Sequence, residues 1–386
     1  MTTCTGDADQ LTLLITTKNR SAMLGRVLRY YRDVGLPYRL LISDASDEAS
    51  ERRQTERWLR ESEGRLRIGY YQESTDLIQS LDALLARVTT PLVLIAGDDD
   101  FFVPSALARC ARFLMEHPDY NSACGDILSI YTHTTPDGRL GLDYSFGDEV
   151  QSVTDASPAK RVARFYSPQK VNTTYFVQRT EHLRYSVGRS ARLQLYLPQN
   201  AFSECTLTSY TLLKGRLKYL PGLCHVRLRH RREPMSKAAR QSLDYVLFIH
   251  EEITRPCWAG KLRLFIDVLS ADVMQHDAVD RRTAVDVAET VFLGWFAPRL
   301  TRNRDRLLAR WRPLARRSPW RTLVKRIPGA AKLWNTLQAL RPGHLSVASA
   351  LRKSSPYHQD FMPIYRTLTS RAATEESAAV PMEALA

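Results

Sequence analysis

Residues 91–100, PLVLIAGDDD, place three consecutive aspartates directly after a short apolar run. The run at 91–96 is short, branched and apolar, which predicts a fully buried strand. Three adjacent carboxylates at the end of such a strand repel one another unless a cation neutralises them. On an extended backbone Asp98 and Asp100 share one face, and two such carboxylates can hold a hard divalent cation that also takes phosphate oxygens. An acidic helix start before Pro104 is the alternative interpretation.

Apolar and amphipathic segments alternate on both sides of this stretch. The expected strands are 11–17, 39–43, 66–71 and 91–96, and the expected helices are 21–33, 49–62, 75–87 and 104–116. This alternation with short loops predicts an α/β fold, a mostly parallel sheet with helices on both faces. Ligands of such sheets bind beyond the carboxyl ends of the strands.

The pattern is looser after about residue 120. Further strands are expected around a Pro-Asp-Gly turn at 136–138, at 173–179 and at 217–220, and further helices at 158–166 and 204–214. Residues 236–297 have mostly helical patterns.

Composition narrows the class of protein. The 386 residues are 44% hydrophobic and 25% charged, which is globular composition. Six scattered cysteines without a CxxC pair exclude a disulfide scaffold and a cysteine zinc site, and they indicate a reducing compartment. The N-terminus lacks the regions of a signal peptide, and no apolar run approaches the roughly 18–20 residues of a membrane span. We therefore expect a cytoplasmic protein.

Most of the formal charge of +14 lies in the segment 299–341. That segment has thirteen basic residues and one acid, Asp305, which leaves about +2 for the rest of the chain. Four of the six tryptophans lie in or beside it, a mixture that suits a helix on an anionic membrane surface. The alternatives are a basic helical cap on the chain's own domain and, least favoured, nucleic-acid binding. Pro313, Pro319 and Pro328 divide the segment into short helices.

Two loops beside the aspartates offer further polar groups. The turn from Thr16 to Arg20 provides hydroxyls, an amide and two cations, and it contains neither GxGxxG nor GxxxxGK[ST]. Asp44, which follows the second strand, could accept hydrogen bonds from a ribose or a base, with an N-cap or Asx turn as the alternative. The chain has neither a serine nucleophile elbow nor an HExxH motif.

Residues 11–104 resemble the start of a GT-A glycosyltransferase of family 2. The matching segments are LTLLITTKNRSAMLGRVLRYY from residue 11, LLISDAS from residue 40 and TTPLVLIAGDDDFFVP from residue 89, the last with the DxD motif. The similarity covers about the first 115 residues well and 116–235 loosely. It implies a nucleotide-sugar donor, a divalent Mn²⁺ or Mg²⁺ ion, and single-displacement transfer with inversion at the anomeric carbon.

The resemblance also implies roles for individual residues. The implied nucleotide-sugar-binding residues are Thr16, Thr17, Arg20, Asp44, Asp98 and Asp99, and the implied metal ligands are Asp98, Asp100 and His230, with His225 as the second histidine. Family members carry an acid at the start of a later helix as general base, and Glu204 in the predicted helix 204–214 is the best match. Many members have an aspartate there, often in a Glu-Asp pair, so Glu204 departs from the pattern. Asp126 and Glu181 are the other candidates for the base.

The chemistry of sugar transfer calls for the same groups. An attacking hydroxyl loses its proton to a carboxylate within reach, and the departing nucleoside diphosphate needs a metal and cations to stabilise it. The basic run 225–232 could supply those cations. If it is extended, Arg227 and Arg229 lie on the same face as His225.

The expected organisation is a GT-A glycosyltransferase domain at 1–235, a helical extension at 236–297, a basic Trp-containing arm at 298–345 and a partly disordered tail at 346–386. The expected acceptor is a glycan or lipid-linked hydroxyl of cell-surface glycan or lipopolysaccharide biosynthesis, and the basic arm would bind the inner face of the cell membrane.

Two other classes of protein stay open. A sugar nucleotidyltransferase would need a glycine-rich first loop, and a non-catalytic membrane- or nucleic-acid-binding protein leaves the three aspartates unexplained.

Overall fold

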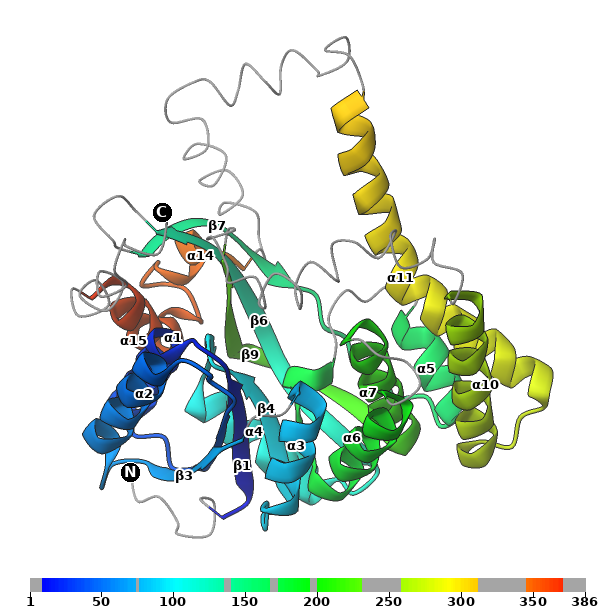
Figure 1. Cartoon of the computed structure of the whole chain (residues 1–386), viewed down its shortest axis with the longest axis horizontal. Coiled ribbons are helices and arrows are strands. Elements are labelled where there is room, and N and C mark those ends of the chain that lie inside the picture. The colour runs from blue at the N-terminus through cyan, green and yellow to red at the C-terminus, as the bar shows by residue number, and fades with distance from the viewer. Residues whose placement is uncertain are drawn as a thin grey trace.

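A single sheet organises the part of the chain that the structure describes, which is residues 9–73, 76–134, 140–166, 173–194, 200–230, 258–311 and 345–370 of a computed structural model. Its strands are β1 (Leu11–Thr17), β2 (Arg39–Asp44), β3 (Arg67–Gln72), β4 (Leu92–Gly97), β5 (Asp100–Phe102), β6 (Tyr120–Thr134), β7 (Leu140–Asp148), β8 (Val177–Arg179) and β9 (Arg216–His230). The spatial order is β3-β2-β1-β4-β8-β6-β9-β5, with β7 paired to β6 (Figure 1). The strands β1 to β4, β6 and β9 run in one direction, which confirms the predicted mostly parallel α/β sheet.

Helices cover both faces of this sheet. They are α1 (Ser21–Asp33), α2 (Ala49–Ser62), α3 (Leu77–Ala86), α4 (Pro104–Glu116), α5 (Pro158–Tyr166), the 3₁₀ turn η1 (Thr173–Tyr175), α6 (Thr180–Gln194), α7 (Asn200–Lys214), α10 (Trp258–His276), α11 (Arg281–Trp311), α14 (Val347–Ala350) and α15 (His358–Thr369). Leu13 belongs to the core that includes α1, α4 and α15, whereas Leu14 belongs to the core with α3 and α6. Because adjacent strand residues point to opposite faces, a central strand covered on both sides is apolar at every position.

The first strands end together. In the parallel pairing of β1 with β2, Thr17 lies opposite Asp44, and in the pairing of β1 with β4, Thr16 lies opposite Gly97. Residues that follow these ends therefore meet at one edge of the sheet, where parallel α/β sheets bind ligands.

The strand β9 is much longer than the predicted strand at 217–220, so that boundary is wrong. It pairs in parallel with β6 along most of its length and includes the basic run up to His230. Val226 and Leu228, which alternate with the basic residues, are buried in the core. The basic run is therefore the end of a half-buried strand in which apolar and basic residues alternate. Its many charged residues made this strand pattern hard to recognise in the sequence.

Three short or polar elements also differ from the sequence-based expectation. Residues 173–179 form the 3₁₀ turn η1 and then β8, and β5 and α6 were not expected. Strands of three residues are too short for periodicity to detect. The helix α6 has few apolar positions: Leu183 and Val187 are buried in the core with α3, and Ala191 packs against it.

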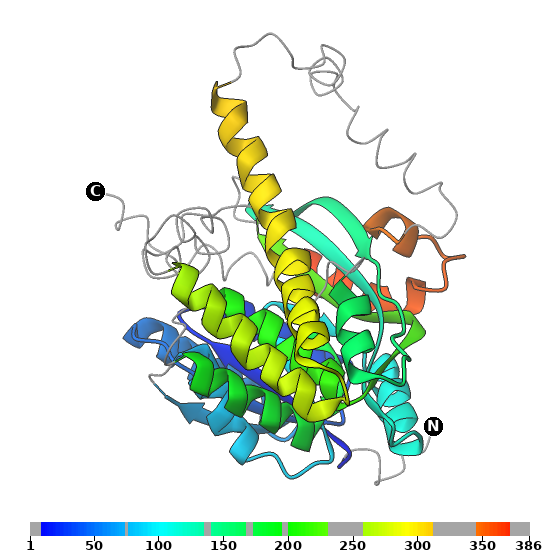
Figure 2. The same cartoon turned by 90° about the vertical axis from the view of Figure 1, so that its right-hand side faces the viewer.

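The helices α10 and α11 pack against α5 and α7, and Phe265, Val287 and Trp295 are buried among them. Asp272 of α10 is 1% exposed and accepts hydrogen bonds from Arg189 of α6 and Tyr210 of α7, both at 2.6 Å. The C-terminal half of α11 extends away from the other helices in both views (Figures 1 and 2). No helix in the described ranges is both long and apolar enough to span a membrane.

Residues 345–370 return to the α/β core. Phe361 and Ile364 of α15 are fully buried in the same cluster as β1 and α1, and Ser105 donates a hydrogen bond to Asp360 at 3.2 Å. The sequence predicts a partly disordered tail over 346–386. The helices in 345–370 depend on tertiary contacts that local sequence does not reveal.

The proposed domain boundaries stay predictions, and α11 passes through residue 298 without a break. Residues 231–257, 312–344 and 371–386 lie outside the described residues.

Candidate active site

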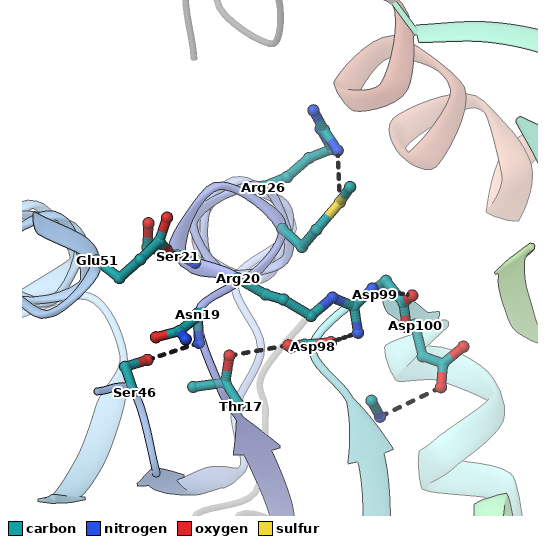
Figure 3. A network of polar contacts seen from close by, with 12 residues as sticks. Thr17, Asn19, Arg20, Ser21, Arg26, Ser46, Glu51, Asp98, Asp99 and Asp100 are labelled. Atoms are coloured by element: carbon teal, nitrogen blue, oxygen red, sulfur yellow. Dashed lines mark hydrogen bonds and ion pairs between the residues drawn. The ribbon is translucent and has the colours of Figure 1, made fainter. Parts of the chain in front are cut away.

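Thr17, Arg20 and Asp98 form the centre of the polar cluster at the carboxyl edge of the sheet (Figure 3). The Thr17 hydroxyl donates to one oxygen of Asp98 at 2.8 Å, and Arg20 Nη1 donates to the other at 2.5 Å. Arg20 Nη2 also donates to Asp99 at 2.5 Å, so one guanidinium bridges two of the three aspartates. The predicted need for a cation at this strand end is thus met in part by the turn after β1.

Burial decides the protonation behaviour of this cluster. Asp98 is 3% exposed, and desolvation raises the pKa of its carboxyl to about 6, with Asp99 adding to the rise and Arg20 opposing it. Burial lowers the pKa of the Arg20 guanidinium, but the attraction of Asp98 and Asp99 outweighs it, so the net shift is upward. Arg20 therefore stays cationic, and the cluster keeps an excess of negative charge for a second cation to balance.

Asp98 and Asp100 do not share a face, so that expectation is wrong. Asp98 and Asp99 form a turn between β4 and β5 rather than an extended strand. Asp98 lies beside Thr17 and Arg20, whereas Asp100 points away from both (Figure 3). One oxygen of Asp100 accepts from the Gly97 backbone N–H at 3.2 Å.

The loops after β1 and β2 are bound to each other, which holds Arg20 in place. Asn19 has a φ of 51°, a left-handed conformation that asparagine tolerates better than most residues. Its backbone N–H donates to the Ser46 hydroxyl at 2.8 Å, and its side chain contacts Asp47. The Ser21 N–H, at the start of α1, donates to Glu51 at 2.7 Å.

Asp44 is fully buried at the end of β2. Its carboxylate accepts from the Ser46 N–H at 2.8 Å and from the Tyr70 hydroxyl at 2.9 Å. The first contact is the Asx turn that the sequence left open as the alternative. A carboxylate has about four acceptor positions, but a fully buried one can reach a ribose or a base only if neighbouring side chains move. Thr16, by strand alternation, lies on the opposite face from Thr17.

His225, rather than His230, lies next to the aspartates. Asp100 Oδ1 is 3.0 Å from His225 Nε2, both side chains are 2% exposed, and neither of these two atoms makes a hydrogen bond within the described residues. The His225 ring stacks on Phe102 with 4.3 Å between ring centroids. His230 is the last residue of β9, three residues beyond Arg227, the register partner of Asp100. The structure describes nothing of its side chain.

The Asp100–His225 pair suits a divalent cation. Two ligand atoms at about 2.1 Å from one ion and at right angles are about 3 Å apart, and carboxylate oxygen with imidazole nitrogen suits first-row metals such as manganese. No group of three or more metal-ligating side chains occurs among the described residues. Mg²⁺-type sites commonly use one or two protein ligands and complete the shell with water and substrate phosphates.

Glu204 lies in the same electrostatic neighbourhood. Its negative charge raises the pKa of Tyr175 and of Arg227. The charges of Asp99 and Asp100 raise the same two pKa values. Glu204 is half-buried and makes no hydrogen bond or ion pair within the described residues. The expectation that it opens its helix is wrong, because α7 begins at Asn200, one turn earlier.

The two other candidates for the base are placed elsewhere. Asp126 accepts from the Tyr219 hydroxyl at 2.6 Å and the Gly222 N–H at 2.9 Å, so it binds the neighbouring turn of β9. Glu181 is the second residue of α6, next to the amino end of β4, and its side chain is 77% exposed. Six residues of strand separate that end from the aspartates, about 17–20 Å.

Sequence reasoning missed Tyr175 and did not separate Arg227 from its basic neighbours. Arg227 lies over the Tyr175 ring at 4.9 Å from the centroid. The alternation of basic and apolar residues in the run 225–232 could have singled out Arg227. No local pattern marks Tyr175, which lies at the end of η1, just before β8.

Comparisons with known proteins give distant similarities. No protein-family model and no curated protein sequence matches the chain. Among solved structures, Staphylococcus aureus TarS aligns at 14% identity and a TM-score of 0.38, covering 68% of this chain and 43% of TarS. TarS 1–349 in complex with UDP-GlcNAc aligns at 14% identity and a TM-score of 0.37, covering 74% of this chain and 92% of that one.

A third similar structure is the mannosyltransferase PcManGT from Pyrobaculum calidifontis in complex with GDP-Man and Mn²⁺. It aligns at 15% identity and a TM-score of 0.36, covering 96% of this chain and 86% of that one. Similarities at these values give no information on the substrates or catalytic residues of this chain.

Proposed function

We propose that the chain is a metal-dependent, inverting glycosyltransferase that moves a sugar from a nucleotide-sugar donor to a hydroxyl acceptor, a member of the GT-A class of family 2. One observation carries the proposal: the three aspartates at the end of β4 lie with Arg20, His225 and Arg227 at the carboxyl edge of the sheet, and Glu204 is near enough to raise the pKa of Arg227. This set combines a cation site, guanidinium groups for phosphate and a separate carboxylate for proton transfer.

The protein groups divide by the part of the donor that they would bind. Asp44 and Thr17, at the ends of β2 and β1, would hold the nucleoside, with Arg20 ordering Asp98 and Asp99 beside it. Asp100 and His225 would hold Mn²⁺ or Mg²⁺. When bound, the ion would stabilise the negative charge of the departing nucleoside diphosphate.

Glu204 would act on the acceptor. Its carboxylate takes the proton of the acceptor hydroxyl while that oxygen forms the bond to the anomeric carbon. The bond from the anomeric carbon to the diphosphate breaks on the opposite side, so the configuration inverts. Glu204 makes no hydrogen bond with another described residue, which supports this role.

Calorimetry with UDP, GDP, CDP, ADP and dTDP, each with Mn²⁺ and with a chelator, tests the class. We expect one nucleotide to bind in the micromolar range and to lose at least tenfold in affinity without the metal, because the ion links acidic side chains to phosphate oxygens. Absence of binding by the whole panel to folded protein would refute the proposed function.

We further propose that the acceptor is a cell-surface glycan or lipopolysaccharide precursor at the inner face of the cell membrane, reached through the basic segment 299–341. The helix α11 supports this, because its second half extends from the body (Figure 2). By helical spacing, the positions of Arg299, Arg302, Arg306 and Arg310 share one face, and Leu300, Leu307 and Trp311 share another. Such a helix suits an anionic membrane surface.

Flotation with vesicles tests the membrane proposal. Replacing Arg299, Arg302, Arg306 and Arg310 together by glutamine is expected to reduce binding to vesicles containing anionic lipid by at least tenfold, because each basic residue near such a surface contributes about 1 kcal/mol. Replacing the exposed Arg281 and Arg282, at the packed start of α11, by glutamine is the matched control. Equal partition of both variants and the unmodified protein would contradict the proposal.

A further inference from the structure

Arg227 is a cation in the candidate active site that forms no ion pair with a carboxylate of the described residues. The antiparallel pairing of β5 with β9 places it directly opposite Asp100. Opposite charges at such positions usually pair across the strands. Here no ion pair joins Arg227 to any described residue, because Asp100 turns its two oxygens toward the Gly97 N–H and His225 instead.

The guanidinium is nevertheless held in one place. It lies over the Tyr175 ring at 4.9 Å from the centroid, and Tyr175 also contacts the His225 ring at 5.5 Å between centroids. Burial lowers the pKa of the Arg227 guanidinium, but the net shift is upward because of the negative charges of Asp100, Glu204 and Asp99. Arg227 is therefore a fixed, half-buried cation whose five N–H groups donate to no described residue.

Arg229 provides the contrast on the same face of the same strand. Its Nε donates to the Ser129 hydroxyl at 3.1 Å, its Nη2 lies 3.8 Å from Asp148, and its guanidinium lies over Phe146 at 5.6 Å. Those contacts join β9 to β6 and β7. The basic run therefore contains one arginine engaged in the sheet and one whose donors are unused beside the predicted cation site.

We propose that Arg227 binds the phosphate of the donor that carries the sugar, the terminal phosphate of the nucleoside diphosphate. This inference rests on the proposed function. A guanidinium recognises phosphate with parallel N–H donors, and Tyr175 holds its plane in advance. When the bond from the anomeric carbon to the phosphate oxygen breaks, the electron pair stays on that oxygen, and an Arg227 N–H donates a hydrogen bond to it. Arg227 thus stabilises the negative charge that develops on the leaving group.

Calorimetry compares the binding of a nucleoside diphosphate with that of the matching monophosphate, both with Mn²⁺. The comparison separates binding of the terminal phosphate by Arg227 from a non-specific effect of its positive charge on any nucleotide. Arg227→Met is expected to weaken diphosphate binding by about 10–100-fold, the usual effect of a lost charged hydrogen bond. It should change monophosphate binding by less than about threefold. Arg229→Met, the matched control, is expected to leave both affinities unchanged.

Two further variants keep the test decisive if Arg227→Met is unstable. Arg227→Lys retains the positive charge without the parallel N–H donors of the guanidinium, and it should lose part of the affinity for the diphosphate only. Tyr175→Leu, which removes the ring under the guanidinium, should show the same selectivity. Equal losses for diphosphate and monophosphate in the folded variants, or no loss, would overturn the inference while the proposed function stands. If the unmodified protein binds no nucleotide, the proposed function fails and this inference fails with it.

Discussion

Replacing Asp100 by asparagine is expected to lower the rate of sugar transfer by about 10²–10³-fold, the usual cost of losing one group that stabilises a leaving charge. Asparagine keeps the shape of the side chain and can still accept from the Gly97 N–H, so the turn between β4 and β5 should persist. What is lost is the anionic oxygen that lies 3.0 Å from His225 Nε2. The measurements are the initial rate with the donor that calorimetry identifies and the Mn²⁺ concentration for half-maximal rate.

The matched control for this prediction is Asp47→Asn. Asp47 is an exposed carboxylate in the loop after β2 that pairs with Lys18 at 3.2 Å and contacts Asn19. Its loss removes the same charge from the same edge of the sheet without touching the proposed cation site. An Asp100→Asn protein that keeps the metal dependence and rate of the unmodified protein would exclude Asp100 as a ligand.

Replacing Glu204 by glutamine is expected to lower kcat by about 10²–10⁴-fold, the range for loss of a general base. Nucleotide affinity should stay within about twofold, because Glu204 acts on the acceptor rather than the donor. Glutamine keeps the size and shape of the side chain but cannot take the proton. Initial rates at saturating donor, with the KM of each substrate, separate this effect from a loss of binding.

Glu181→Gln is the matched control, since it is the same change in the first turn of a neighbouring helix, at the far end of β4. We expect its kcat to be unchanged. If Glu204→Gln retains full kcat, another group takes the proton and the base assignment is wrong, while the donor site is unaffected.

Much of the α/β core could be predicted because its signals are local. The strands at 11–17 and 91–96 are apolar at nearly every position, as expected of strands buried on both faces. The helices at 21–33 and 104–116 match the structure at both ends, because Pro104 begins one and the apolar spacing defines both. Asp44 and Asp98 were recognised as site candidates from their position after strands alone.

The partners of these residues could not be predicted, because they depend on pairings between distant segments. The choice between His225 and His230 depends on the register of β5 against β9, and a shift of one residue would bring the other side of the basic run to Asp100. Glu204, Asp126 and Glu181 look alike in sequence, and only the packing of α7 places Glu204 near Arg227. Tyr175 and Arg20 likewise meet their partners across long stretches of chain.

The sequence by itself determined the order of strands and helices over residues 11–116 apart from β5, the edge of the sheet at which the aspartates lie, and the concentration of charge in 299–341. These depend on periodicity and composition, which nearby residues set. Tertiary structure decided that Asp98 turns to Arg20 and Asp100 to His225, that Arg229 is bound to Ser129 and Asp148 while Arg227 is not, and that α15 completes the core beside α1. These depend on register and on which side chains are desolvated together, and both arise only when segments far apart in the chain pack against one another.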